Sequence, residues 1–156
     1  MSEVIILMGS KSDIEWSKKI ASSCEKFGIK ATLRVASAHK TPLKCLEIIK
    51  EYENKDVVFI TVAGRSNALS GFVDAQTDKP VISCPPYGDK FAGADIFSSI
   101  RMPSGVAPML VLEPENAGLA AAKILALTDS DIKKKVIEYQ RKMKEKIQKD
   151  DEEING

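Results

Sequence analysis

The only histidine of this 156-residue chain is His39, in the segment "VASAHKTP". An apolar stretch typical of a strand precedes it, and a stretch with helical periodicity follows it. Because the unperturbed pKa of histidine lies near neutrality, its imidazole can accept and return a proton at cellular pH. The sequence has no second histidine and no cysteine cluster, which disfavours a metal site. We therefore regard His39 as a candidate general acid–base, with a purely structural role as the alternative.

Hydroxyl and charged side chains at two predicted strand ends are suited to a phosphorylated sugar. In "GSKSD", Ser10 supplies a hydroxyl and Asp13 an acceptor for a ribose diol. In the histidine segment, Ser37 and Lys40 supply a hydroxyl and a positive charge for a phosphate. The alternative for the first segment is that Ser12 or Asp13 only caps the following helix. Neither segment matches a Walker loop or GxGxxG, so no triphosphate or dinucleotide site is indicated.

A third segment rich in small residues, "AGRSNALSG", also follows an apolar run. We expect a turn whose backbone N–H groups and Asn67 amide line a pocket. The letters "GRSNA" also nearly match the GxSxG nucleophile elbow, with Ser66 as the nucleophile of a serine hydrolase. Ala68 replaces the second glycine and His39 precedes the serine in the chain, so the hydrolase is a distant alternative.

Short apolar runs and amphipathic stretches alternate along the chain and would position these three segments. Strands that are apolar throughout and alternate with helices indicate a parallel sheet covered on both faces. We predict an α/β fold: a flavodoxin-like, doubly wound, five-stranded parallel sheet in three αβα layers, with ligands beyond the carboxyl ends of the strands. The predicted strands are 4–8, 30–35, 57–63, 81–83 and 109–112, and the predicted helices are 13–27, 43–52, 67–76 and 115–127.

The C-terminal region carries an extra helix. Residues 1–128 are predicted to form one catalytic domain, residues 129–150 an amphipathic helix capped by Ser130, and residues 151–156 an acidic tail. The helix has a narrow apolar stripe on a charged, mainly basic surface. We expect the stripe to pack on a neighbouring subunit; the alternative is that it packs on its own domain. The stripe consists of Ile132, Val136, Tyr139, Met143 and Ile147.

A 22-residue connection, 84–105, joins the fourth and fifth predicted strands. Because this is long for a compact domain, we predict a helix-containing flap over the site. Cys84, at its start, is expected to be a buried filler and not a nucleophile.

Composition indicates a globular protein that binds neither nucleic acid nor a membrane. Hydrophobic residues make up 44% of the chain, charged residues 29%, and the formal net charge is +1. Three widely spaced cysteines argue against disulfides and indicate a reducing compartment. The N-terminal apolar run is too short for a signal peptide or membrane span, so a cytoplasmic location is expected.

The loop segments occur together in a known family. "MGSKSD", "SAHKTP", "AGRSNALSG", "PVISCPP", "SSIRMPSG" and "EPENAGLAAAKIL" span residues 4–127 in the order found in the PurE family of purine biosynthesis. The sequence resembles the second class of that family, phosphoribosylaminoimidazole carboxylase. The resemblance implies that carbon dioxide is joined directly to aminoimidazole ribonucleotide, without ATP, giving the 4-carboxy product.

Two departures separate the chain from the first class, the mutases that rearrange an N-carboxylated isomer. Their third loop reads like GGAAHLPG and contains a histidine, whereas this chain has "GRSNALSG"; it also has "SAHK" where mutases have SAHR. Mutase activity is the first alternative to the carboxylase.

The resemblance also implies roles for individual residues, no cofactor, and an octamer whose active sites are built at subunit contacts. His39 corresponds to the catalytic histidine of the family. The implied nucleotide-binding residues are Ser10, Asp13, Ser37 and Lys40, and the loop around the transferred carboxyl group is Gly64, Arg65, Ser66 and Asn67, with Ser70 as a further substrate-binding residue.

Two other protein classes share the predicted fold. A flavin-binding electron carrier would need a Ser/Thr–Gly cluster that the first loop lacks. A response-regulator domain would need an aspartate at the end of the third strand, where this chain reads "VAGR". Flavin binding is therefore a distant alternative, and a signalling domain is not supported.

Overall fold

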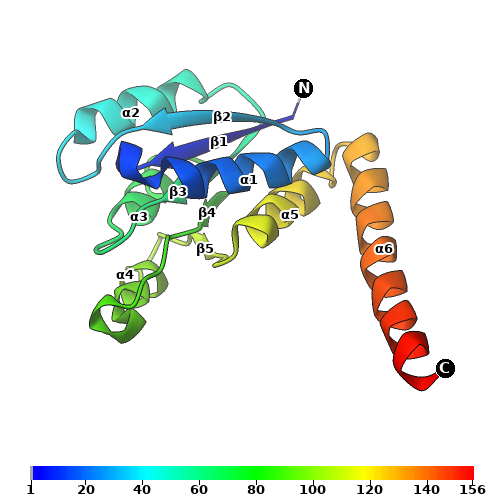
Figure 1. Cartoon of the computed structure of the whole chain (residues 1–156). Coiled ribbons are helices and arrows are strands. Elements are labelled where there is room, and N and C mark those ends of the chain that lie inside the picture. The colour runs from blue at the N-terminus through cyan, green and yellow to red at the C-terminus, as the bar shows by residue number, and fades with distance from the viewer. Residues whose placement is uncertain (1) are drawn as a thin grey trace.

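The computed structural model describes residues 2–156 and contains an all-parallel sheet with the strand order β2–β1–β3–β4–β5 (Figure 1). This confirms the predicted doubly wound α/β fold. The last strand is shorter than predicted, because it pairs only at the sheet edge with a short neighbour. The strands are β1 (Glu3–Met8), β2 (Lys30–Val35), β3 (Val57–Val62), β4 (Val81–Ser83) and β5 (Met109–Leu110).

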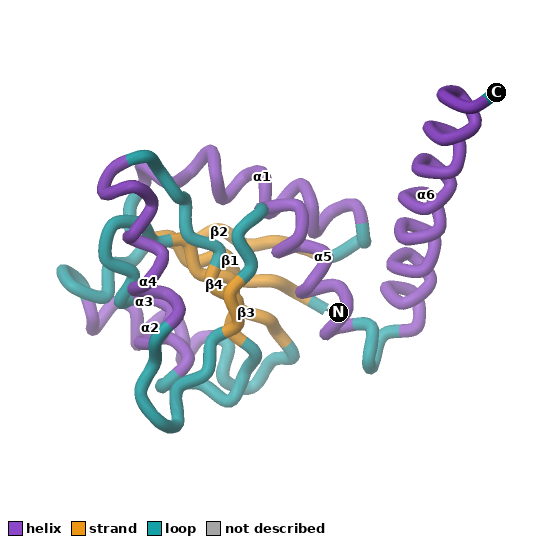
Figure 2. Tube along the Cα trace, turned by 90° about the horizontal axis from the view of Figure 1, so that it is seen from below, coloured by secondary structure: helices purple, strands orange, loops and turns teal. Residues whose placement is uncertain are grey.

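Helices cover both faces of the sheet (Figure 2). Alternate side chains of β1 enter opposite layers: Ile6 packs with α1 and α5, whereas Ile5 packs with α2 and α3. All residues of β3 are buried, as expected for a central strand covered on both faces. The covering helices are α1 (Ile14–Lys26), α2 (Pro42–Glu51), α3 (Leu69–Asp74) and α5 (Pro114–Leu125).

Strand register brings three loops together. Met8, the last residue of β1, pairs with Val35 of β2 and with Val62 of β3. The N–H of Gly9 donates to the carbonyl of Val62 at 2.9 Å, and the N–H of Ala36 donates to the carbonyl of Met8 at 3.0 Å. The loops after β1, β2 and β3 therefore leave the sheet side by side, where the strand order reverses and such folds bind ligands.

The C-terminal helix, α6 (Ser130–Asn155), is longer than predicted. Its N-cap is Asp129, one residue before the predicted cap, because the Asp129 carboxylate accepts hydrogen bonds from the N–H groups of Asp131 (3.0 Å) and Ile132 (3.1 Å). The helix also continues through the predicted acidic tail, since Asp and Glu are tolerated within a helix. None of the helices in residues 2–156 has the length and apolar character needed to span a membrane.

The apolar stripe of α6 divides into two parts. Ile132 and Val136 are buried in the core beside α1 and α5, and Tyr139 packs partly against them. Met143 and Ile147 are 46% and 67% exposed, on the part of the helix that projects from the body (Figure 1). The first half thus packs on its own domain, which leaves only the second half for a neighbouring subunit.

The predicted flap contains two short helical segments. The 3₁₀ helix η2 (Lys90–Ile96) leads directly into α4 (Phe97–Ile100), and together they stand beyond the carboxyl end of the sheet (Figure 1). Phe91 and Ala92 within η2 have positive φ values of 54° and 51°, a backbone conformation that non-glycine residues rarely adopt.

Candidate active site

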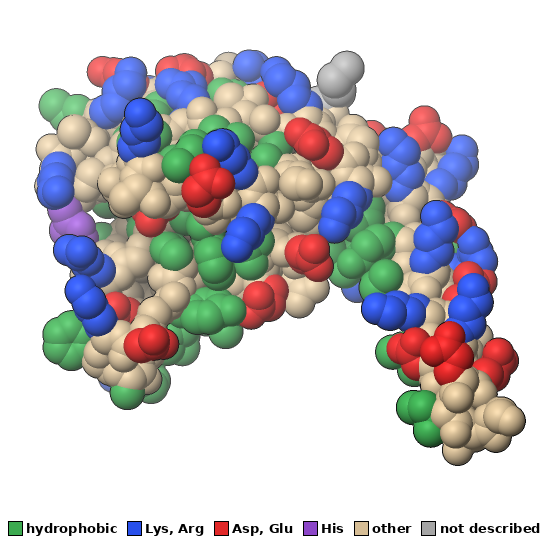
Figure 3. Space-filling model, viewed as in Figure 1, with side chains coloured by type: hydrophobic (Ala, Val, Ile, Leu, Met, Phe, Trp, Pro, Cys, Tyr) green, Lys and Arg blue, Asp and Glu red, His purple; other side chains and the backbone are tan. Residues whose placement is uncertain are grey.

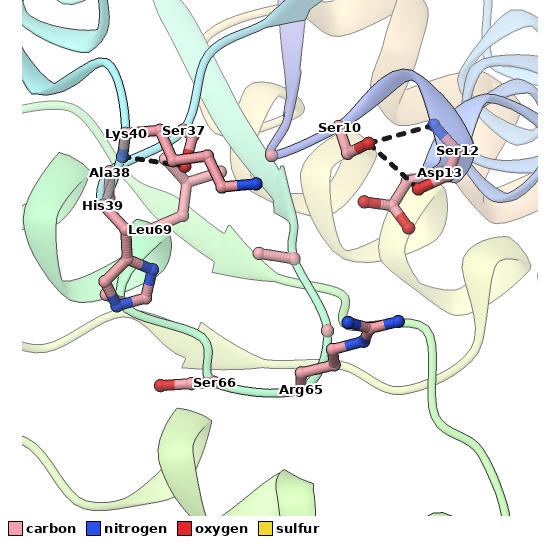
Figure 4. Close-up of a pocket in the computed structure, with 14 residues that line it drawn as sticks. Ser10, Ser12, Asp13, Ser37, Ala38, His39, Lys40, Arg65, Ser66 and Leu69 are labelled. Atoms are coloured by element: carbon pink, nitrogen blue, oxygen red, sulfur yellow. Dashed lines mark hydrogen bonds between the residues drawn. The ribbon is translucent and has the colours of Figure 1, made fainter.

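A cavity of about 480 Å³ opens where the loops after β1, β2 and β3 meet (Figure 4). Eight predicted site residues line it, so three segments that are distant in sequence form one site. They are Ser10, Asp13, Ser37, His39, Lys40, Gly64, Arg65 and Ser66. Sequence reasoning missed the apolar part of the lining, Ala38, Ala63, Ala68 and Leu69, because such residues carry no chemical signal.

The first loop presents a carboxylate to the cavity. The hydroxyl of Ser10 caps the 3₁₀ helix η1 (Lys11–Asp13) by accepting hydrogen bonds from the N–H (3.2 Å) and the hydroxyl (3.0 Å) of Ser12. Asp13 makes no capping hydrogen bond to α1, and its carboxylate points into the cavity (Figure 4). Partial burial raises the pKa of Asp13 above its usual value. The capping role therefore belongs to Ser10, and Asp13 remains open to a ligand.

The second loop is a tight turn held by hydroxyl groups. The hydroxyl of Ser37 accepts from the N–H of Lys40 at 3.1 Å, and the hydroxyl of Thr41 accepts from the N–H of Ser37 at 2.9 Å. This turn directs the ammonium group of Lys40 towards the centre of the cavity, facing Asp13 (Figure 4). His39 projects from the same turn and is exposed.

The third loop brings Arg65 and Ser66 along a further side of the cavity (Figure 4). Arg65 has a φ of 62°, a backbone conformation that non-glycine residues rarely adopt, and the chain bends there. Gly64 lies close to the next loop: a β-carbon at this position would be 3.2 Å from the carbonyl oxygen of Pro86. A larger residue at Gly64 would push the two loops apart.

The lining is predominantly cationic. Lys40 and Arg65 oppose a single carboxylate, Asp13. In the space-filling view, His39 lies at the edge of the molecule, with basic side chains on either side of it (Figure 3). Such a site favours a ligand with phosphate or carboxylate groups.

Two predicted site residues, Asn67 and Ser70, do not line this cavity. Asn67 is only 4% exposed, and its amide nitrogen donates to the hydroxyls of Ser83 and Ser99, both at 2.8 Å. Ser70 is fully buried in the first turn of α3. The expectation that the Asn67 amide lines the pocket is therefore wrong, because this side chain satisfies its hydrogen bonds inside the protein.

The geometry does not support nucleophilic catalysis by Ser66 or Cys84. Ser66 lies in the middle of a loop between Val62 and Leu69, not at a tight strand–helix elbow, and no hydrogen bond joins it to His39 within residues 2–156. Cys84 is fully buried, and burial raises the pKa of its thiol to about 12. Across those same residues, no group of three His, Cys, Asp or Glu side chains could hold a metal ion.

Comparison with known proteins supports the resemblance drawn from the loops. Residues 3–146 match the family model described as AIR carboxylase. A protein of Archaeoglobus fulgidus named phosphoribosylaminoimidazole carboxylase is 68% identical over 97% of this chain and 84% of its own length. A protein of the same name from Treponema denticola is 52% identical, over 97% of this chain and 96% of its own length.

Solved structures agree over the whole chain. The crystal structure of Treponema denticola PurE superposes with a TM-score of 0.98 at 50% identity, covering 100% of both chains. A second crystal structure, of a variant of Treponema denticola PurE2, gives a TM-score of 0.96 at 50% identity over 99% of both chains. Since sequence, fold and site loops all agree, this chain belongs to the AIR carboxylase family.

Proposed function

We propose that this protein joins carbon dioxide to 5-aminoimidazole ribonucleotide, reversibly and without ATP, giving 4-carboxy-5-aminoimidazole ribonucleotide. One observation carries the proposal: the only histidine of the chain opens into the same cavity as the hydroxyl, cationic and carboxylate groups suited to a nucleotide. The name shared by the relatives at 68% and 52% identity, phosphoribosylaminoimidazole carboxylase, supports the same reaction. The distant alternatives, a serine hydrolase and a flavin-binding protein, have no such support.

The nucleotide would lie between the first two loops. The phosphate would accept hydrogen bonds from the hydroxyls of Ser10 and Ser37 and pair with the ammonium group of Lys40. The carboxylate of Asp13, on the opposite side of the cavity, would accept hydrogen bonds from the ribose diol. This orientation is supported by the facing positions of Lys40 and Asp13 (Figure 4).

His39 would act on the ring carbon of the aminoimidazole. The amino group makes this ring an enamine, so the ring carbon donates an electron pair to carbon dioxide and a carbon–carbon bond forms. That carbon then carries both hydrogen and carboxylate. The neutral imidazole of His39 removes the proton, and the released electron pair restores aromaticity; in reverse, the imidazolium protonates the carbon and carbon dioxide leaves. General acid–base catalysis of this kind contributes roughly 10²–10⁴ in rate.

The third loop would hold carbon dioxide. Negative charge develops on its oxygens as the new bond forms, and the backbone N–H groups of Gly64 and Ser66, with the guanidinium of Arg65, would stabilise this charge. The position of all three residues along the cavity supports this role. Holding both reactants in one site lowers the barrier further. The reaction as written needs no metal, ATP or other cofactor.

We also infer a cytoplasmic homo-oligomer, an octamer by resemblance to the family. The exposed Met143 and Ile147 on the projecting part of α6 support contact with another subunit. All three cysteines, Cys24, Cys45 and Cys84, are free and buried, which suits a reducing compartment.

The reaction is tested by supplying aminoimidazole ribonucleotide and bicarbonate without ATP and following the 4-carboxy product. The expected result is rapid product formation, with little turnover of the N-carboxylated isomer beyond its spontaneous breakdown at low bicarbonate. Preference for that isomer would make the protein a mutase. Absence of turnover with both substrates would refute the proposal.

A further inference from the structure

Asn67 belongs to the third loop, and its hydrogen bonds join this loop to three other elements. Its amide nitrogen donates to the hydroxyl of Ser83 in β4 and to the hydroxyl of Ser99 in α4, each at 2.8 Å. Its amide oxygen accepts from the N–H of Ser70 at 3.1 Å, and its own N–H donates to the hydroxyl of Ser98 at 2.9 Å. One buried residue thus connects the third loop, the sheet, the start of α3 and the flap.

The two hydrogens on the amide nitrogen go to different partners. One bonds the sheet through Ser83 and the other bonds the flap through Ser99, so neither partner can be lost without leaving a buried N–H unsatisfied. Asn67 directly follows Arg65 and Ser66, which line the cavity. A displacement of α4 would therefore be transmitted to these cavity residues through a buried link.

Side-chain hydrogen bonds hold the flap at two places. At its start, the hydroxyl of Tyr87 donates to the carboxylate of Glu113 at 2.8 Å, and its ring packs edge-on against Trp16 with centroids 5.5 Å apart. Further along, in α4, the hydroxyls of Ser98 and Ser99 accept hydrogen bonds from Asn67 of the third loop. The intervening η2 has no buried residue.

We propose that Asn67 is a positioning residue that couples the flap to the third loop, so that Arg65 and Ser66 are correctly placed for carbon dioxide only when α4 is docked. This inference rests on the proposed carboxylase function for its kinetic consequence. The coupling itself is a property of the fold and has its own readout, because exposed Lys90 and Arg101 make the flap a trypsin substrate when α4 leaves its place.

The test uses variants that each remove one hydroxyl. Ser99→Ala removes one of the two hydrogen bonds between Asn67 and the flap and leaves an amide hydrogen of Asn67 without its partner. Ser83→Ala removes the hydrogen bond to the sheet, and Ser104→Ala removes an exposed hydroxyl outside this network as a matched control. Each variant is compared with the unmodified protein in kcat, in KM for bicarbonate, in Kd for the nucleotide, in melting temperature, and in the rate of tryptic cleavage of the flap.

The expected result is specific to Ser99→Ala. Cleavage after Lys90 or Arg101 should accelerate, and kcat/KM for bicarbonate should fall roughly 10- to 100-fold, the effect of a small misplacement of reacting groups. The nucleotide Kd should stay unchanged, because Ser10, Ser37 and Lys40 are on other loops. Ser83→Ala should lower the melting temperature without accelerating cleavage of the flap.

The coupling would be overturned if Ser99→Ala only lowered the melting temperature, while its cleavage rate and kinetics equalled those of Ser104→Ala. If the unmodified protein does not carboxylate the nucleotide, the proposed function fails, and the cleavage rates alone decide whether Asn67 holds the flap. Accelerated cleavage confined to Ser99→Ala would then still support the link.

Discussion

His39 is exposed and belongs to neither core cluster, so its replacement should affect chemistry and leave folding intact. We predict that His39→Asn lowers kcat for carboxylation roughly 10²–10⁴-fold, because asparagine cannot take the proton from the ring carbon. The nucleotide Kd and the melting temperature should change little. Steady-state kinetics measure kcat, titration calorimetry measures the nucleotide Kd, and a thermal melt gives the melting temperature. Near-normal turnover in this variant would remove His39 from the mechanism.

Asp13 should link nucleotide binding to pH. Burial raises the pKa of this carboxyl above its usual value, and only its ionised form offers both oxygens to a ribose diol. Affinity should therefore fall as the pH drops through that raised pKa, and Asp13→Asn should bind more weakly at pH 7 without this acidic loss. The ratio of the two nucleotide Kd values, measured against pH, cancels the titration of the phosphate itself; a constant ratio would contradict the role.

The same pKa shift has a consequence for stability. A carboxyl with a raised folded-state pKa contributes stability below its unfolded pKa and loses it as pH rises through the folded value. Without ligand, Asp13→Asn should accordingly have a slightly higher melting temperature than the unmodified protein at pH 7. Such a gain is expected when a charged side chain serves ligand binding at a cost to stability.

Residue types at the site were predictable from the sequence, whereas side-chain directions were not. Glycine, serine and lysine after consecutive apolar runs indicated a site for an anion, and parallel strands placed those runs' ends together. Nothing in "GRSNALSG" distinguishes Ser66, which enters the cavity, from Asn67, which turns inward. That difference depends on Ser83 and Ser99, which are distant in sequence.

At the scale of elements, apolar runs predicted the central strands well because these strands are buried on both faces. Edge and loop elements were less predictable. The strand β5 spans two residues, and α3 begins at Leu69, later than predicted, because Asn67 is held by tertiary hydrogen bonds and stays outside the helix. The flap conformation, with Phe91 and Ala92 at positive φ, carries no local sequence signal.

The contact between α1 and α5 depends on the absence of a side chain at Gly118. A β-carbon there would be 2.3 Å from the hydroxyl oxygen of Ser23 and 3.0 Å from the backbone nitrogen of Cys24. Ser23 cannot move freely, because its hydroxyl donates to the carbonyl of Glu115 at 2.8 Å. The two helices therefore approach closely only with glycine at this position.

We predict that Gly118→Ala destabilises the protein although alanine is the better helix former. Overpacking costs about 1–3 kcal/mol and loss of the Ser23 hydrogen bond about 1 kcal/mol, against a helix-propensity gain of about 1 kcal/mol. Chemical denaturation measures the change, with Lys123→Ala, an exposed site on α5, as a control expected to be nearly neutral. Unchanged or increased stability of Gly118→Ala would show that α1 and α5 can separate at little cost.

At the scale of the whole molecule, α6 is the one helix of residues 2–156 whose second half projects away from the body (Figure 1). Its first turns belong to the core of the domain, but the rest projects away with an apolar stripe and no covering layer (Figure 1). Residues 133–149 carry eight Lys or Arg and two Glu. If nothing covered this part of the helix, its apolar stripe would be exposed to water between charged side chains. An apolar stripe on a projecting, charged helix is stabilised when another subunit covers it.

We predict that Ile147→Lys weakens assembly while the individual domain stays folded. Ile147 is 67% exposed, so the charge costs the isolated chain little, whereas burial of an unpaired ammonium group at a subunit contact is strongly unfavourable. Gln148→Lys adds the same charge about 100° around the helix, outside the stripe, and serves as the matched control. Sedimentation velocity should show smaller species only for Ile147→Lys, with an unchanged far-ultraviolet circular dichroism spectrum. Identical sedimentation of both variants and the unmodified protein, whether as an assembly or as a monomer, would mean that this half of α6 does not join subunits.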